Sequence, residues 1–201
     1  MKKIIPFLLL LLLAASCDFY SAEDYLNSGI SKNKIKDYKG ALEDYDKAIE
    51  INKDLAEAYY NRGNSKSKLK DFQGALQDYD KAISLKPDYP MAYSNKGAVK
   101  CRMENYSGAI RDYDKAIEMK PDFGDAYYNR GSAKFKLGDY AGAIADYDKD
   151  IELNKDDAAA YYTRGCAKLA LKDKEGSCLD FNKASELGKS EAYDMKEKYC
   201  K

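Results

Sequence analysis

Acidic and basic side chains are abundant in this chain, and their spacing decides what chemistry they can perform. The sequence has 34 acidic and 34 basic residues, so its formal net charge is zero. Five aspartates recur every 34 residues: Asp44, Asp78, Asp112, Asp146 and Asp180. Arg62, Arg130 and Arg164 follow the same period. Catalytic acid–base pairs need two groups in different environments, whereas a repeated position gives equivalent ones. The pattern predicts ion pairs stacked along a repeating structure.

Several kinds of chemistry are excluded by what the sequence lacks. It contains no histidine, which excludes serine–histidine and cysteine–histidine catalysis and any histidine-ligated metal. The spacing of the five cysteines offers no zinc site. The glycines are isolated and do not form a phosphate-binding loop. The balanced charge argues against a nucleic-acid partner. We therefore expect a protein that is not an enzyme, with no catalytic residue, metal ion, cofactor or small-molecule substrate.

The elements that position these residues form a repeating unit, of which Ala56–Tyr89 is one copy. One glycine series recurs at intervals of 34 residues, and a second follows eleven residues behind it: Gly29, Gly63, Gly97, Gly131 and Gly165, then Gly40, Gly74, Gly108, Gly142 and Gly176. A fixed period of this length is typical of repeat arrays. Each unit has two helical patterns separated by a short break, and apolar residues line one face of the second. The sequence thus predicts an all-α solenoid of helix pairs.

The unit resembles the tetratricopeptide repeat. Counted from Ala56, that family's pattern has an aromatic residue at position 4, a small residue at 8, alanine at 20 and 27, an aromatic at 24 and proline at 32. This copy matches with Tyr59, Gly63, Ala75, Tyr79, Ala82 and Pro87. The resemblance covers about residues 22–191. It implies a right-handed superhelix of five repeats (22–55, 56–89, 90–123, 124–157 and 158–191), with a capping helix over residues 190–201. It also implies a protein-binding scaffold whose first helices line a concave groove.

Two copies depart from the pattern. In the fourth copy Asp150 replaces the alanine at position 27. An unpaired buried charge is costly, so we expect this carboxylate either to turn outward or to find a partner, for which Arg130 and Arg164 are the candidates. The fifth copy is degenerate, with Ser177 and Phe181 at positions usually held by alanine and tyrosine. Degenerate terminal units are typical of repeat arrays, because their outer face meets water.

An asparagine series is the candidate binding site. Asn27, Asn61, Asn95 and Asn129 occupy position 6 of the first four copies, and Thr163 replaces them in the fifth. The series resembles the asparagine ladder of some tetratricopeptide arrays, in which each amide both donates to and accepts from a peptide backbone. Tyr60, Tyr128 and Tyr162, one residue earlier, are candidates for apolar contact in the groove. The alternative is that these asparagines are solvated remnants of a duplicated unit. The lysines and arginines of a two-carboxylate clamp are absent, because Leu26, Asn64, Met91 and Asn95 occupy those positions.

The cysteines divide into three groups. Cys178 and Cys200 lie on the last second helix and on the predicted cap, where antiparallel packing favours a disulfide between them. Cys101 and Cys166 lie on first helices two repeats apart, too far to bridge. Cys17 belongs to the N-terminal segment.

That N-terminal segment resembles a bacterial lipoprotein signal. Lys2 and Lys3 precede an apolar run, Ile4–Ala15, which is too short for a membrane-spanning helix and fits a signal peptide. Residues 1–16 would be removed, and Cys17 would be acylated and joined to the first helix by a tether over residues 17–21. The alternative is an ordinary signal peptide with an incidental cysteine. Asp18 resembles an inner-membrane retention signal in some bacteria, so the choice of membrane stays open.

These inferences together predict a non-enzymatic scaffold anchored to a membrane of the bacterial envelope by lipid. Its groove would bind an extended segment of a protein partner, in the manner of an envelope assembly adaptor. The alternative is a structural scaffold that docks through its convex face or edges and leaves the groove empty.

Overall fold

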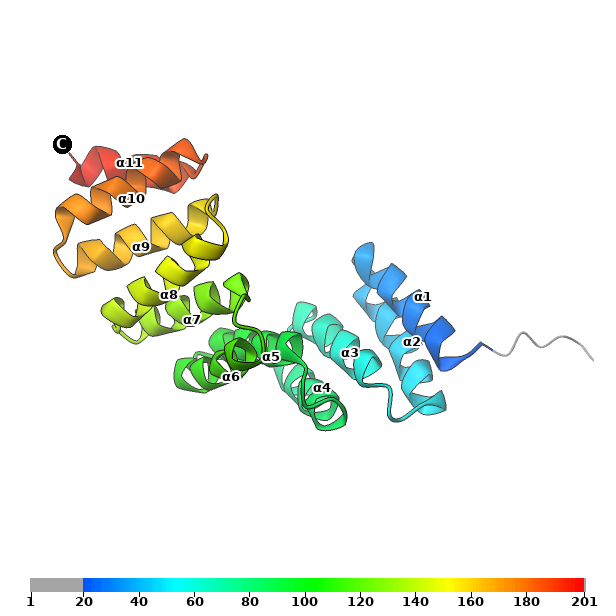
Figure 1. Cartoon of the computed structure of the whole chain (residues 1–201). Helices are drawn as coiled ribbons and strands as arrows, with labels where there is room; N and C mark the ends of the chain where they lie inside the picture. Colours follow the sequence, from blue (N-terminus) through cyan, green and yellow to red (C-terminus); the bar gives the residue numbers. More distant parts are fainter. Residues whose placement is uncertain (1–19, 201) are drawn as a thin grey trace, which may run out of the picture.

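The computed structural model describes residues 20–200, and this part of the chain forms eleven α-helices (Figure 1). Ten of them form five consecutive pairs, and the eleventh caps the C-terminal end. The bounds are α1 Ala22–Lys34, α2 Tyr38–Ile51, α3 Ala56–Lys68, α4 Phe72–Leu85, α5 Pro90–Arg102, α6 Tyr106–Met119, α7 Gly124–Lys136, α8 Tyr140–Leu153, α9 Ala158–Ala170, α10 Lys174–Glu186 and α11 Ser190–Tyr199. The all-α array of five helix pairs with a cap, expected from the sequence, is confirmed.

Each second helix begins with the same capped turn. An N-cap side chain accepts a hydrogen bond from the backbone N–H of the glycine three residues later, at 2.9–3.0 Å. The pairs are Asp37–Gly40, Asp71–Gly74, Asn105–Gly108, Asp139–Gly142 and Asp173–Gly176. A Cβ at Gly74 would lie 2.2 Å from a carboxylate oxygen of Asp71, so glycine leaves room for the cap. This explains the second glycine series.

The core repeats with the sequence. The aromatic residue at position 24 of every copy is at most 1% exposed: Tyr45, Tyr79, Tyr113, Tyr147 and Phe181. Its ring lies against the glycine of the first helix, and a Cβ at Gly63 would lie only 2.9 Å from Cε1 of Tyr79. The first glycine series therefore permits close packing of the two helices, as the sequence predicts.

The helix pairs follow one another along an arc (Figure 1). Each second helix packs against the first helix of the next repeat, and neighbouring first helices α1, α3, α5, α7 and α9 also contact one another. At the C-terminal end α11 packs on α10, and a disulfide joins Cys178 to Cys200 with a Cα–Cα distance of 5.6 Å. These are the two cysteines that the sequence singles out.

Within residues 20–200 no helix has both the length and the apolar character needed to cross a membrane. The same residues contain no cluster of three or more cysteine or carboxylate side chains arranged to hold a metal ion. The signal segment and Cys17 lie outside the described residues.

Candidate functional site

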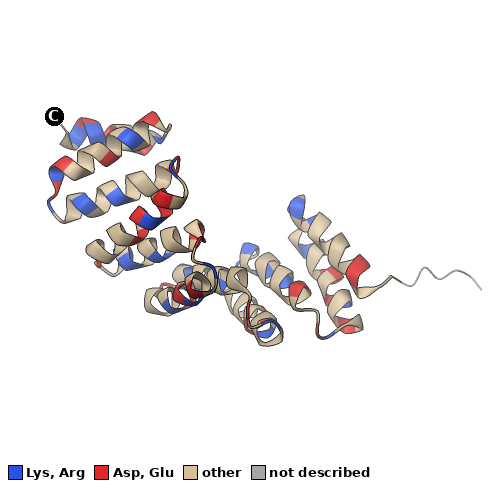
Figure 2. Cartoon of the chain, viewed as in Figure 1, with Lys and Arg blue, Asp and Glu red and all other residues tan. Residues whose placement is uncertain are grey.

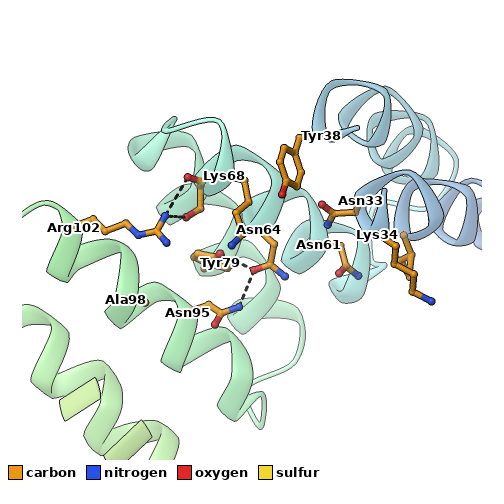
Figure 3. A pocket seen from close by; sticks show the side chains of 12 residues that line it. Asn33, Lys34, Tyr38, Asn61, Asn64, Lys68, Tyr79, Asn95, Ala98 and Arg102 are labelled. Atoms are coloured by element: carbon orange, nitrogen blue, oxygen red, sulfur yellow. Dashed lines mark hydrogen bonds between the residues drawn. The ribbon is translucent and has the colours of Figure 1, made fainter. Parts of the chain in front are cut away.

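A pocket of about 440 Å³ lies on the first helices of the first three repeats (Figure 3). Helices α1, α3 and α5 supply most of its lining, and Tyr38 of α2 and Tyr79 of α4 complete it. Its polar lining includes four asparagines: Asn33, Asn61, Asn64 and Asn95. A volume of this size fits a short stretch of a ligand and not a whole domain.

The centre of the pocket is a hydrogen-bonded group of side chains. Oδ1 of Asn64 accepts hydrogen bonds from the hydroxyl of Tyr79 and from Nδ2 of Asn95, both at 2.8 Å. Nδ2 of Asn95 also donates to the hydroxyl of Tyr60 at 3.0 Å. These bonds fix the orientation of both amides and leave Nδ2 of Asn64 as a donor and Oδ1 of Asn95 as an acceptor toward the pocket. Figure 3 shows Asn64 and Asn95 facing one another.

Asn61 has a similar arrangement one helical turn away from Asn64. Its Nδ2 donates to the backbone oxygen of Glu57 at 3.0 Å, which leaves Oδ1 as an acceptor. An amide with one atom held by the protein and another open to the groove can meet an N–H or a C=O of an extended chain. The pocket is therefore chemically suited to contact a polypeptide backbone.

The structure places only half of the predicted asparagine series in this pocket. Asn61 and Asn95 line it, whereas Asn27 is exposed at the start of the array and Asn129 lies outside the lining. Asn129 differs because Ser94 and Ala98 occupy the positions that Tyr60 and Asn64 hold one repeat earlier. Whether the series binds a ligand stays a prediction.

Sequence reasoning missed Asn33 and Asn64. They are absent from the 34-residue series because each lies at a different position of its repeat. A signal was nevertheless present, since Asn33, Asn64 and Asn95 are spaced 31 residues apart. This spacing moves back by about one helical turn per repeat and so crosses the first helices diagonally.

The three predicted groove tyrosines serve mainly in packing. Tyr60 lies against the rings of Tyr79 and Tyr89, with ring centroids 6.1 and 4.9 Å away. Tyr128 and Tyr162 are likewise half-buried, each beside the core aromatic ring of its own repeat. None of the three lines the described pocket.

The periodic charges form ion pairs stacked along the array, as the sequence predicts. We call this series of ion pairs between basic side chains of the first helices and aspartates of the second helices the ladder. Arg62 donates through Nε and Nη2 to both carboxylate oxygens of Asp78, at 2.9 and 2.6 Å, and through Nη1 to Asp46 of the preceding repeat at 2.7 Å. Burial disfavours the charged guanidinium, but the hydrogen bonds to Asp78 and Asp46 outweigh it and raise the pKa of Arg62. Arg130 and Arg164 repeat the arrangement, so both signs of charge alternate along the array (Figure 2).

Asp150 neither pairs with Arg130 or Arg164 nor turns outward, so both expectations for it are wrong. Arg130 and Arg164 are committed to the carboxylates of the ladder, and Oδ2 of Asp150 is buried without a hydrogen-bond partner among the described residues. Only 2% of this residue is exposed. Burial, together with the nearby carboxylates of Asp157 and Asp125, raises the pKa of Asp150 to about 6.

Cys101 and Cys166 are free thiols of intermediate exposure. Burial raises the pKa of both, and this outweighs the opposing hydrogen bonds from Tyr113 and Tyr162. A raised pKa disfavours the thiolate, which is the reactive form. Neither cysteine has the character of a nucleophile.

Models of two repeat families match the chain. The model described as tetratricopeptide repeat matches residues 56–89 and 124–157, and the one described as TPR repeat matches 33–70 and 97–138. Together they cover residues 33–89 and 97–157, more than half of the sequence. Comparison with curated protein sequences gives no match.

Three solved structures illustrate the similarity of fold. MamA of Desulfovibrio magneticus RS-1, solved from residue 41 to its end, superposes with a TM-score of 0.77 at 24% identity, over 84% of this chain and 96% of that solved chain. YrrB, described as a TPR protein with an unusual peptide-binding site, gives 0.74 at 22% identity, over 89% of this chain and 93% of YrrB. PilF of Pseudomonas aeruginosa gives 0.77 at 16% identity, over 83% and 76% respectively.

Proposed function

We propose, from the premise that this chain belongs to the tetratricopeptide-repeat family, that it binds an extended segment of a partner protein in the groove of its first three repeats. As a repeat scaffold of this family the chain is not an enzyme. Its function therefore depends on which molecules its surfaces bind.

The observation that carries the proposal is the group of amides in the pocket. Asn61, Asn64 and Asn95 are each held by one hydrogen bond or more from or to the protein, and each leaves a polar atom toward the groove. Pre-oriented polar groups lower the entropic cost of binding. Because the open atoms include both a donor and acceptors, they match the alternating N–H and C=O groups of an extended backbone. The description of YrrB as having a peptide-binding site is consistent with this use of the fold.

Selection of peptides from a displayed random library tests the proposal. Peptides that bind the native protein should lose binding to the variant Asn61→Ala, Asn95→Ala. The matched control is Asn27→Ala, Asn129→Ala, which removes the two asparagines outside the pocket and should keep binding. Circular dichroism must first show that both variants fold. Equal binding by the two variants would remove the pocket as the binding site.

We further propose that the protein acts at a bacterial envelope membrane, held there by an acylated Cys17. The support is the N-terminal pattern of Lys2, Lys3, an apolar run and a cysteine that follows small residues. The acyl chains would then supply the membrane tether, since no described helix can span a bilayer. Mass spectrometry of the N-terminal peptide from membrane-derived protein should find a diacylated or triacylated cysteine. A free amine on an unmodified Cys17 would contradict the anchor.

A second candidate is docking through an edge of the array. The residue that directly follows each first helix is apolar and exposed, with exposed fractions between 39% and 76%: Ile35, Leu69, Met103, Leu137 and Leu171. Rows of exposed apolar side chains are typical of interaction surfaces. This scaffold function is favoured if partner binding survives the loss of Asn61 and Asn95 but is lost when Leu69 and Leu137 are replaced by serine.

A further inference from the structure

The groove pocket carries a set of positive charges that nothing in the described chain neutralises. Lys34, Lys68 and Arg102 line it, and no lining residue is acidic. None of the three makes an ion pair with a described residue; Arg102 only donates weakly to the backbone and hydroxyl oxygens of Ser67, at 3.4 and 3.3 Å. The pocket is therefore cationic, although the whole sequence has no net charge.

These cations differ from the basic residues of the ladder. Arg62 and Lys66 lie on the same helix as Lys68, and both pair with Asp78 at 2.6–2.8 Å. The ladder residues occupy positions 7 and 11 of each repeat, where they face the aspartates of the second helices. The pocket residues occupy position 13, at the end of each first helix, where the structure gives them no carboxylate. Figure 3 shows the side chain of Lys68 directed toward Asn64 and Tyr79.

We propose that the groove selects an acidic segment, an extended polypeptide with carboxylate side chains at intervals of about three residues; this inference rests on the function proposed above. The interval follows from geometry. The cations lie one per repeat on α1, α3 and α5, and packed helices lie ~8–10 Å apart. An extended chain in the polyproline II conformation rises ~3.1 Å per residue with three residues per turn, so every third side chain faces the same way and meets the next cation. The amides between them would hold the backbone.

The spacing also decides between two sources of carboxylate. A free C-terminus carries a single carboxylate and would meet one cation, leaving those of the other repeats unused. Three cations on three successive repeats favour several acidic side chains within a segment. The lysine at the same position of the fourth repeat, Lys136, lies outside the pocket lining and is exposed. It offers a matched control of identical chemistry.

Fluorescence anisotropy with two labelled peptides tests the inference. One peptide carries glutamate at every third position between serines and alanines, and the other carries glutamine at the same positions; both end in an amide. At low salt the native protein should bind the glutamate peptide roughly tenfold more tightly, as expected for three partly exposed charge pairs. The preference should shrink as salt is added.

The variants locate the source of this preference. Lys34→Gln, Lys68→Gln should lose most of it, and because both side chains are exposed the variant should fold. Lys136→Gln should keep it. Equal affinity for the two peptides, or an equal loss in the Lys136→Gln control, would overturn the inference. A second pair of the same peptides, made with a free C-terminal carboxylate, completes the test, and a preference that appears only in this pair would also overturn the inference.

Failure of this inference is distinguishable from failure of the proposed function. Displayed peptides that depend on Asn61 and Asn95, yet carry no excess of acidic residues and bind Lys34→Gln, Lys68→Gln normally, would leave the groove as a binding site and remove its acidic selectivity. If no selected peptide depends on Asn61 and Asn95, both proposals fall.

Discussion

Replacement of Asp150 by alanine is expected to stabilise the protein at neutral pH. Most substitutions of buried residues destabilise a protein, so the expected gain is unusual. Asp150 is 2% exposed and its Oδ2 has no hydrogen-bond partner in the described chain. The other four repeats have alanine at this position: Ala48, Ala82, Ala116 and Ala184. Each of those alanines is fully buried, so the fold accepts alanine here.

The magnitude follows from the pKa of Asp150. Burial and the carboxylates of Asp157 and Asp125 raise it to about 6 from an ordinary value of 3.8. A raised pKa in an acid means that the folded protein binds the proton more tightly than the unfolded chain does. The destabilising contribution is therefore absent below the unfolded value, grows between the two values and is complete above pH 6. Two pKa units correspond to ~3 kcal/mol.

Chemical denaturation of the native protein and Asp150→Ala across this pH range is the assay. The variant should gain up to ~3 kcal/mol at neutral pH and almost nothing below about pH 3, because Asp150 is then protonated in both states. Asp146→Ala is the matched control, since Asp146 is equally buried but pairs with Arg130 and Lys134. Its loss removes the carboxylate that pairs with Lys134 and leaves Arg130 with Asp114 alone, so it should cost ~1–3 kcal/mol. An Asp150→Ala variant that is no more stable than the native protein above pH 6 would refute this reasoning.

Three further predictions concern packing, hydrogen bonding and the cap. Gly63→Ala should cost ~1–3 kcal/mol in urea denaturation, because the new methyl group would meet the buried ring of Tyr79 at 2.9 Å; unchanged stability would contradict this contact. Tyr45→Phe should be close to neutral, because its buried hydroxyl interacts with the side chain of Asn33 without forming a well-aligned hydrogen bond. Tyr79→Phe should cost ~1 kcal/mol, because it removes the hydrogen bond from the Tyr79 hydroxyl to Oδ1 of Asn64. Equal changes in stability for Tyr45→Phe and Tyr79→Phe would contradict this difference between the two hydroxyls. Reduction of the disulfide between Cys178 and Cys200, which closes 22 residues, should destabilise the cap by ~3 kcal/mol and speed amide exchange in α11, whereas unchanged exchange would show that packing alone holds it.

The fold could be predicted because identical positions carry the same physical demand in every repeat. The tyrosine of position 24 needs a glycine opposite it, and Gly63 with Tyr79 shows the contact that the whole series repeats. The capped turns follow the same logic, since an Asp or Asn side chain binds the N–H of the glycine three residues later in each second helix. Because the period is held five times, each of these inferences is supported by several copies. One degenerate copy therefore does not change the predicted fold.

The pocket could not be predicted in full because its residues are neighbours across repeats. Asn33, Asn64 and Asn95 come together only because adjacent first helices pack against each other at a stagger, which a 34-residue period does not reveal. The prediction for Asp150 failed for a related reason. Arg130 and Arg164, the candidate partners that the repeat pattern suggests, already pair with other aspartates. The sequence alone does not show which aspartate each arginine binds.

Residues that depart from the repeat are therefore more informative about function than the repeat itself. They occur in sets, in which one changed residue contacts another changed residue. Asn64 replaces the alanine or serine found at its position in the third and fourth copies, and with it come the bond to Tyr79 and the bond from Asn95. Asp150 is likewise matched by Gly124, where a Cβ would lie 2.8 Å from Oδ1 of Asp150. Drift of single residues in a duplicated unit would not require matched neighbours in the adjacent helix. Because the first set opens polar atoms into a pocket and the second is closed inside the array, only the first offers free hydrogen-bonding atoms to a molecule outside this chain.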